Sequence, residues 1–162
     1  MNFNSSLVSI GNFDFKLNHL LIIGILSLSF STSFMLRSLP ADYGWELNEF
    51  DPFFNYRATQ YIVDNGIDAY FQWNDELSWY PHGRDVSSNS QIMLHLTAAT
   101  TYSIFGAGGN LYDFAIIFPV IIGSLTAIVV FALVRIIGGT TAGLFAALLF
   151  SISTPIKIGR AH

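Results

Sequence analysis

The sequence of 162 residues contains 52% hydrophobic but only 11% charged residues, whereas about a quarter of the residues in a soluble domain are charged. Its formal net charge of −4 disfavours a nucleic-acid-binding surface, and the absence of cysteine excludes disulfides and thiolate metal sites. Because the hydrophobic residues are gathered in separate blocks, the sequence predicts an α-helical integral membrane protein embedded in a lipid bilayer.

Three stretches without Asp, Glu, Lys or Arg are close to the roughly 20 residues that a helix needs to cross a bilayer. They predict transmembrane helices over residues 17–36, 111–135 and 139–157, after a cytoplasmic N-terminus of residues 1–16. The first stretch could instead be a secretory signal. Its apolar core is longer than about 15 residues, however, and no A-x-A-like cleavage site follows, so an uncleaved anchor is favoured.

The apolar stretch of residues 91–105 decides the topology. Segments of this length more often lie in the membrane interface, or are buried in protein, than span a bilayer. If it does not cross, Lys16 and Arg135 both face the cytoplasm, as the positive-inside tendency favours; if it crosses, Arg135 lies outside. We therefore expect an interfacial helix here.

A tight turn near Gly138 should join the second and third spans. Gly139 and Gly143, at the start of the third span, form a small-xxx-small pair that allows close packing on a neighbouring helix. Residues 158–162 would then begin a second external loop.

The first external loop, residues 37–110, should carry the function, because loops longer than about 12–15 residues are uncommon unless they are functional. Within it, Asp51 before Pro52 predicts an N-cap followed by a helix of about Pro52 to Asp64, which ends before Gly66. A cap alone is the commoner role for such an aspartate. Its second oxygen would still be free to hold a divalent cation or accept a hydrogen bond from a substrate.

A second dense patch of the loop, "WYPHGRD" at residues 79–85, predicts an interfacial turn. His82 is able to bind a metal and Arg84 a phosphate oxygen, although both could equally be solvated side chains. Four other acids of the loop are expected to form a solvated face: Asp64, Asp68, Asp75 and Glu76.

The string "EFDPFFNYRAT", residues 49–59, resembles the signature of the catalytic subunit of oligosaccharyltransferase, the family called STT3 in eukaryotes and AglB in archaea. "SWYPHGRDV", residues 78–86, is similar to a second segment of that family, and the resemblance extends over roughly residues 17–160. It implies that the chain is the N-terminal part of a multi-span inverting glycosyltransferase membrane domain. Such enzymes transfer an oligosaccharide from dolichol phosphate or pyrophosphate to Asn in Asn-x-Ser/Thr.

The resemblance implies that Asp51 is the catalytic aspartate, which binds Mn²⁺ or Mg²⁺ and contacts the acceptor amide. His82 is the candidate second metal ligand, and Arg84 and Arg57 are candidates for contact with the lipid phosphate or substrate. The sequence ends at His162, before the family's second acidic motif and its sequon-reading domain, so this polypeptide alone is expected to be inactive.

Two other functions stay open: a different lipid-phosphosugar-dependent membrane glycosyltransferase, and a non-catalytic membrane scaffold in which Asp51 only caps a helix. The composition and His82 favour an archaeal cell membrane with the active site on its outer face. The alternative is the endoplasmic reticulum membrane with a lumenal active site.

Overall fold

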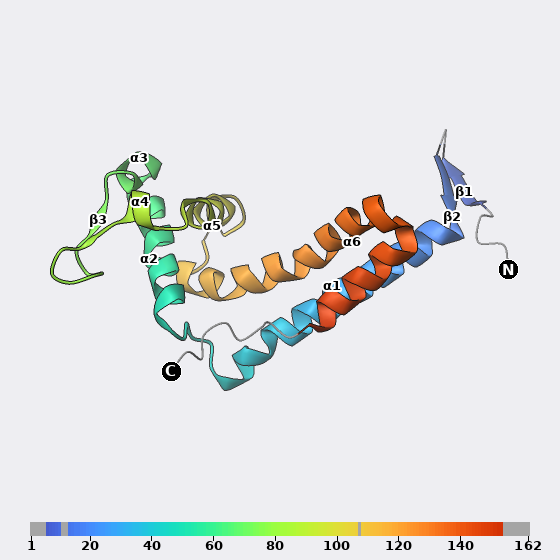
Figure 1. The fold of residues 1–162 in the computed structure, drawn as a ribbon, viewed down its shortest axis with the longest axis horizontal. Coiled ribbons are helices and arrows are strands. Elements are labelled where there is room, and N and C mark those ends of the chain that lie inside the picture. Colours follow the sequence, from blue (N-terminus) through green and yellow to red (C-terminus); the bar gives the residue numbers. More distant parts are fainter. Residues whose placement is uncertain (1–5, 11–12, 107, 154–162) are drawn as a thin grey trace. The chain divides into compact units, whose positions relative to one another are not determined.

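The computed structural model describes residues 6–10, 13–106 and 108–153, with side chains from residue 15 onward. The chain divides into two compact units. Figure 1 shows the fold, coloured by position in the sequence. Unit 1 combines Met1–Tyr43 with Pro119–His162, and unit 2 is Gly44–Phe118.

Unit 1 begins with two antiparallel strands, β1 (Ser6–Ile10) and β2 (Phe13–Lys16), which pair Ile10 with Phe13 and which the sequence analysis did not anticipate. They lead into α1 (Leu17–Ser38) and the short 3-10 helix η1 (Leu39–Tyr43). Helix α1 covers the predicted range 17–36 and, with η1, is long and apolar enough to cross a membrane.

The second long apolar helix is α6 (Leu111–Ile152), whose 42 residues would extend about 63 Å if they were straight. The backbone leaves helical geometry at Gly139, with φ 82° and ψ 174°, and the helix turns back on itself in Figure 1. This bend lies one residue beyond the turn predicted near Gly138. Residues 154–157 of the predicted third span, and the predicted loop 158–162, lie outside the described residues.

Close packing at a glycine holds together the two limbs of α6, which are its helical segments before and after Gly139. A Cβ atom on Gly143 would lie only 2.9 Å from the carbonyl oxygen of Phe131, twelve residues earlier, which a straight helix would place about 18 Å away. The small residue is therefore needed at Gly143, where the limbs meet, as the sequence predicted. The other glycine of the predicted packing pair, Gly139, lies at the bend, and a Cβ atom there would meet nothing within 4 Å. Helix α1 joins this packing through Arg37, whose guanidinium lies 5.2 Å from the ring centre of Phe150 and beside Gly123.

Unit 2 is built around α2 (Phe50–Asn65), which packs on α5 (Ile92–Phe105). Helix α2 ends before Gly66, as predicted. The φ of Gly66 is 83°, which suits glycine, and the N–H of Gly66 donates to the carbonyl of Ile62 at 2.8 Å. Helix α2 supplies Ala58 and Ile62 to the core, with Phe54 and Tyr61 packed against it. The shorter elements are α3 (Ile67–Tyr70), β3 (Asn74–Asp75), β4 (Arg84–Asp85) and α4 (Val86–Asn89).

Hydrogen bonds tie the two ends of unit 2 together. The indole Nε1 of Trp45 donates to Asp113 Oδ1 at 2.9 Å, and the N–H of Leu47 donates to the hydroxyl of Tyr112 at 3.0 Å. The Tyr112 ring also meets Tyr56 of α2 edge to face, with 5.4 Å between ring centres. The start of α6 is therefore anchored on the segment that leads into α2.

A series of hydrogen-bonded polar side chains crosses the core of unit 2. His95 of α5 has no exposed surface; its Nδ1 lies 2.7 Å from the hydroxyl of Tyr70 and its Nε2 lies 2.9 Å from Asn55 Oδ1. The Tyr70 hydroxyl also contacts Ser90 Oγ at 2.8 Å. Burial, and secondly the charge of Arg84, lower the pKa of His95 to about 4, so the imidazole is neutral at physiological pH.

Replacing Gly143 with leucine is expected to destabilise the α6 hairpin, because the new side chain meets the backbone oxygen of Phe131, which cannot turn aside. Overpacking of this kind costs about 1–3 kcal/mol in the free energy of unfolding. Unfolding by denaturant in detergent micelles measures the loss. The matched control is Gly24→Leu in α1, where the added side chain meets nothing within 4 Å; equal stability of the two variants would contradict the packing described above.

The stability of unit 2 should depend on pH through His95. Its folded-state pKa of about 4 lies below the usual value near 6.5, so the unfolded chain binds more protons between these values. Keeping His95 neutral in the folded protein therefore adds up to about 3 kcal/mol to the free energy of unfolding. This stabilisation is fully present above about pH 6.5 and is lost as the pH falls towards 4.

NMR titration of the His95 ring in micelles tests the low pKa directly. Replacing His95 with glutamine should flatten the stability profile between pH 4 and 6.5. A His95 ring that becomes protonated near pH 6.5 in the folded protein would show that this description of the core is wrong.

Candidate functional site

Asp51 lies in the first turn of α2, and its predicted role as the N-cap is wrong. The helix begins at Phe50, and its N-cap position is taken by Glu49, with φ 85° and no capping side-chain bond. Pro52 is accommodated inside the first turn, where a helix has no partners for its N–H groups in any case. The Asp51 side chain is exposed and makes no hydrogen bond or ion pair with any residue that the structure describes. Both carboxylate oxygens are therefore available to a ligand.

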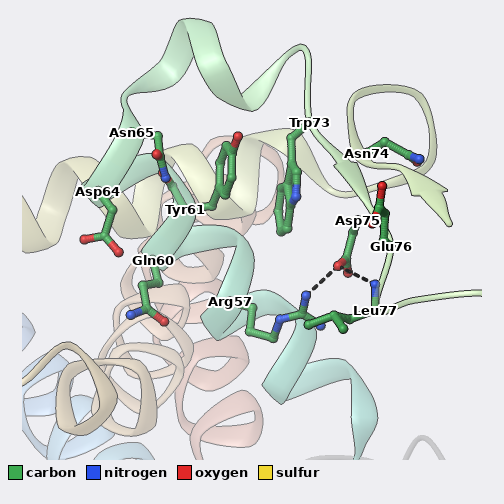
Figure 2. A pocket seen from close by; sticks show the side chains of 10 residues that line it. All are labelled: Arg57, Gln60, Tyr61, Asp64, Asn65, Trp73, Asn74, Asp75, Glu76 and Leu77. Carbon is green, nitrogen blue, oxygen red and sulfur yellow. Dashed lines mark hydrogen bonds and ion pairs between the residues drawn. The ribbon is translucent and has the colours of Figure 1, made fainter.

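Arg57 lies six residues further along α2 and forms an ion pair. Its Nη2 lies 2.5 Å from Oδ1 of Asp75, whose side chain is only 2% exposed (Figure 2). Asp75 also accepts hydrogen bonds from the backbone N–H of Leu77 at 3.2 Å and from Ser78 Oγ at 2.5 Å. The expectation that Asp75 belongs to a solvated face is wrong, because it is the buried anchor of this loop. The other three acids predicted for that face are exposed: Asp64, Asp68 and Glu76.

Arg84 is held between two aromatic rings. The centre of its guanidinium lies 4.0 Å from the ring centre of Phe54 and 4.9 Å from that of Trp79, within range of cation–π attraction. Its Nη2 donates to the carbonyl of Asn89, while its buried Nε has no hydrogen-bond partner in the described part of the chain. These contacts fasten the turn of residues 79–85 to α2, three residues beyond Asp51.

His82 is exposed on that segment, which forms a turn as the sequence predicted. The backbone N–H groups of His82 and Gly83 both donate to the carbonyl of Trp79, at 3.2 Å each. The described residues contain no group of three or more His, Asp or Glu side chains placed to hold a metal ion. Asp51 is chemically suited to a hard cation, but these residues do not complete the usual shell of about six ligands.

Sequence reasoning found no role for two residues that organise this region, Asp75 and His95. Asp75 meets Arg57 across 18 positions of sequence, a spacing that carries no signal in a loop. His95 carried a weak signal, since a polar ring within a short apolar helix needs a buried partner.

Replacing Asp75 with asparagine should lower the free energy of unfolding by about 1–3 kcal/mol, because Arg57 then loses the anion that offsets its charge. The loss stays below that of a fully buried pair because the Arg57 side chain is 34% exposed. Thermal unfolding in micelles measures the effect, with Asp64→Asn on the exposed surface of α2 as the matched control. A variant as stable as that control would mean that the ion pair does not hold the loop.

Comparison with known proteins identifies the family. The model of the family described as "Oligosaccharyl transferase STT3, N-terminal" matches residues 20–155. The chain is 34% identical over 139 residues to the dolichyl-diphosphooligosaccharide–protein glycosyltransferase subunit stt-3 of Caenorhabditis elegans, which covers 83% of this chain and 18% of that protein. It is 32% identical over 147 residues to the STT3 subunit of Dictyostelium discoideum, covering 88% of this chain and 20% of that one.

The chain thus spans about a fifth of the length of these two relatives. The family match includes the whole of unit 2, Gly44–Phe118, with Asp51 and the turn that carries His82. Because the match extends over most of the chain, the protein belongs to the STT3 family of oligosaccharyl transferases, and it aligns with the family's N-terminal part.

Proposed function

We propose that this chain forms the part of an oligosaccharyltransferase catalytic subunit that presents Asp51 to the substrates. The reaction transfers a dolichol-linked oligosaccharide, carried on phosphate or pyrophosphate, to the asparagine of Asn-x-Ser/Thr with inversion at the sugar carbon. The observation that carries the proposal is the exposed Asp51 carboxylate, free of partners among the described residues, at the start of a helix fixed by its neighbours. The two relatives are named as dolichyl-diphosphooligosaccharide–protein glycosyltransferase subunits, which supports the reaction class.

The chemistry explains why a free carboxylate is useful. An amide nitrogen is a poor nucleophile because its lone pair is conjugated with the carbonyl. A carboxylate that accepts a hydrogen bond from an N–H turned out of the amide plane would weaken that conjugation. A bound Mn²⁺ or Mg²⁺ would offset the charge that develops on the leaving phosphate. We assign Asp51 as one oxygen ligand of that cation and His82 as a candidate second ligand. The remaining ligands would come from outside the described residues.

The contacts of Arg57 and Arg84 favour supporting roles. Arg57 pairs with Asp75, and Arg84 is packed between Phe54 and Trp79. Direct contact of either residue with the lipid phosphate would require these interactions to be exchanged or shared. We therefore assign both arginines to holding the loop of unit 2 on α2.

We further propose that α1 and both limbs of α6 cross the bilayer, which places unit 2 on the external side. The two ends of unit 2 are tied together by the bonds of Trp45 and Leu47, so the chain enters and leaves this unit close together. With three crossings, Lys16 and Arg135 lie on the cytoplasmic side. The outer face of an archaeal cell membrane and the lumenal face of the endoplasmic reticulum are the same topological side, and unit 2 belongs there in either case.

Replacing Asp51 with asparagine or alanine in the intact subunit that carries this segment should lower sequon-dependent glycosylation at least about 100-fold. Because Asp51 does not cap α2, neither change should alter the fold. The assay measures transfer of the glycan to a peptide containing Asn-x-Thr, and Asp68→Asn, an exposed acid on α3, is the matched control.

A membrane scaffold makes the opposite prediction, because it needs no carboxylate at this position. Wild-type transfer by the Asp51→Asn variant would favour the scaffold and contradict the proposed function. This chain assayed by itself should give no transfer, since it supplies one carboxylate and one candidate histidine of the site.

A further inference from the structure

A hollow of about 400 Å³ lies beside α2, and neither Asp51 nor His82 lines it (Figure 2). This volume is within the range of about 300–1,000 Å³ that is usual for small-ligand sites. One wall is formed by α2, including Gln60, Tyr61 and Asp64. The other wall is formed by the segment after α3, including Trp73 and Glu76.

Two stacked aromatic rings stand in the hollow. The rings of Tyr61 and Trp73 are parallel within 3°, with 4.2 Å between their centres, and both side chains are half-buried. Both pack against the hydrophobic core of unit 2, which fixes their orientation. They present a rigid aromatic surface that needs little ordering when a ligand binds.

The charges around the rings exclude several classes of ligand. The positive charge of Arg57 is offset by Asp75 at 2.5 Å, which leaves Asp64 and Glu76 as the uncompensated charges of the lining. A negative hollow repels phosphates and nucleotides. A metal ion is disfavoured because the described residues bring no three metal-binding side chains together. A lipid chain is disfavoured because it would bury the polar groups of the wall.

We propose that this hollow binds one or two residues of a neutral oligosaccharide. Such a ligand has a face of C–H groups that suits the negative face of an aromatic ring, and hydroxyls that donate to carboxylates. Asp64 and Glu76 supply those acceptors, while the side-chain amides of Gln60 and Asn65 supply both donors and acceptors. Transfer of a lipid-linked oligosaccharide, the proposed function, would bring a glycan of this kind to the same unit.

The proposal rests on the proposed function only for the source of the glycan, since the chemistry of the hollow by itself points to a neutral sugar. A test with free sugars keeps the two apart. Loss of transfer by the Asp51 variant would say nothing about the hollow, and failure of sugars to bind would leave the role of Asp51 intact.

Saturation-transfer NMR on the purified chain in detergent micelles is the experiment, with N,N′-diacetylchitobiose, mannobiose and maltotriose as probes. We expect binding by at least one probe, with the strongest transfer to the C–H protons of one sugar face. The double variant Asp64→Asn with Glu76→Gln should weaken binding about tenfold, the effect of losing about 1.4 kcal/mol. The matched control is Asp68→Asn, an exposed acid that does not line the hollow.

A second variant, Trp73→Phe, preserves an aromatic ring and should reduce the saturation transfer to the sugar without removing it. Circular dichroism establishes that each variant is folded. The proposal is overturned if no probe binds at about 10 mM, a concentration above the millimolar affinity expected of an open site. Binding that is unchanged in the Asp64 and Glu76 variant would also overturn it. So would binding of an Asn-x-Thr peptide at these residues in place of every sugar, because the hollow would then be a peptide site.

Discussion

The buried carboxylate of Asp75 is the constraint on which unit 2 depends. A charge with 2% of its side-chain surface exposed is tolerable only with partners, and Arg57 of α2, Ser78 and the backbone of Leu77 supply them. This set of bonds fastens the loop after α3 to the middle of α2. The same helix carries Asp51 at its start, so the loop and the candidate catalytic carboxylate belong to one rigid piece.

A second fastening acts nearer to Asp51. Arg84 lies over Phe54, and Trp79 covers it from the turn that carries His82. Beneath it, Phe54 also meets the ring of His95 edge to face, with 5.6 Å between ring centres. The neutral His95 joins α5 to α2 through Asn55, without placing a positive charge in the core. Asp51 thus lies in the first turn of α2, and contacts of the following residues hold this helix in place.

The sequence predicted the elements whose signals are local. The charge-free stretches predicted the positions of α1 and α6. The turn was predicted near Gly138, one residue before the bend, and close packing was predicted at Gly143. The string around Asp51 predicted the family that the comparison then showed. These features depend on composition or on residues close together in the chain, so one sequence suffices to find them.

The features that sequence reasoning missed depend on contacts between distant positions. Asp75 looked like one of several solvated acids, and only the fold shows that it meets Arg57. The N-cap rule failed at Asp51 because the helix begins at Phe50 and accommodates Pro52 within its first turn. The strands β1 and β2 were missed because their four- and five-residue stretches precede the long apolar run that dominates the pattern.

The proposed function requires that the side chain at position 51 be exposed on the external face of the membrane. The chain has no cysteine, so a single Asp51→Cys variant can be labelled without background. In sealed vesicles of known orientation, a membrane-impermeant maleimide should label this cysteine from the external side, whereas a cysteine introduced at the buried position of Ala99 should stay unlabelled. Labelling of the Asp51→Cys variant only after the vesicles are opened, or no labelling of it in the folded protein, would show that position 51 does not face the external solvent.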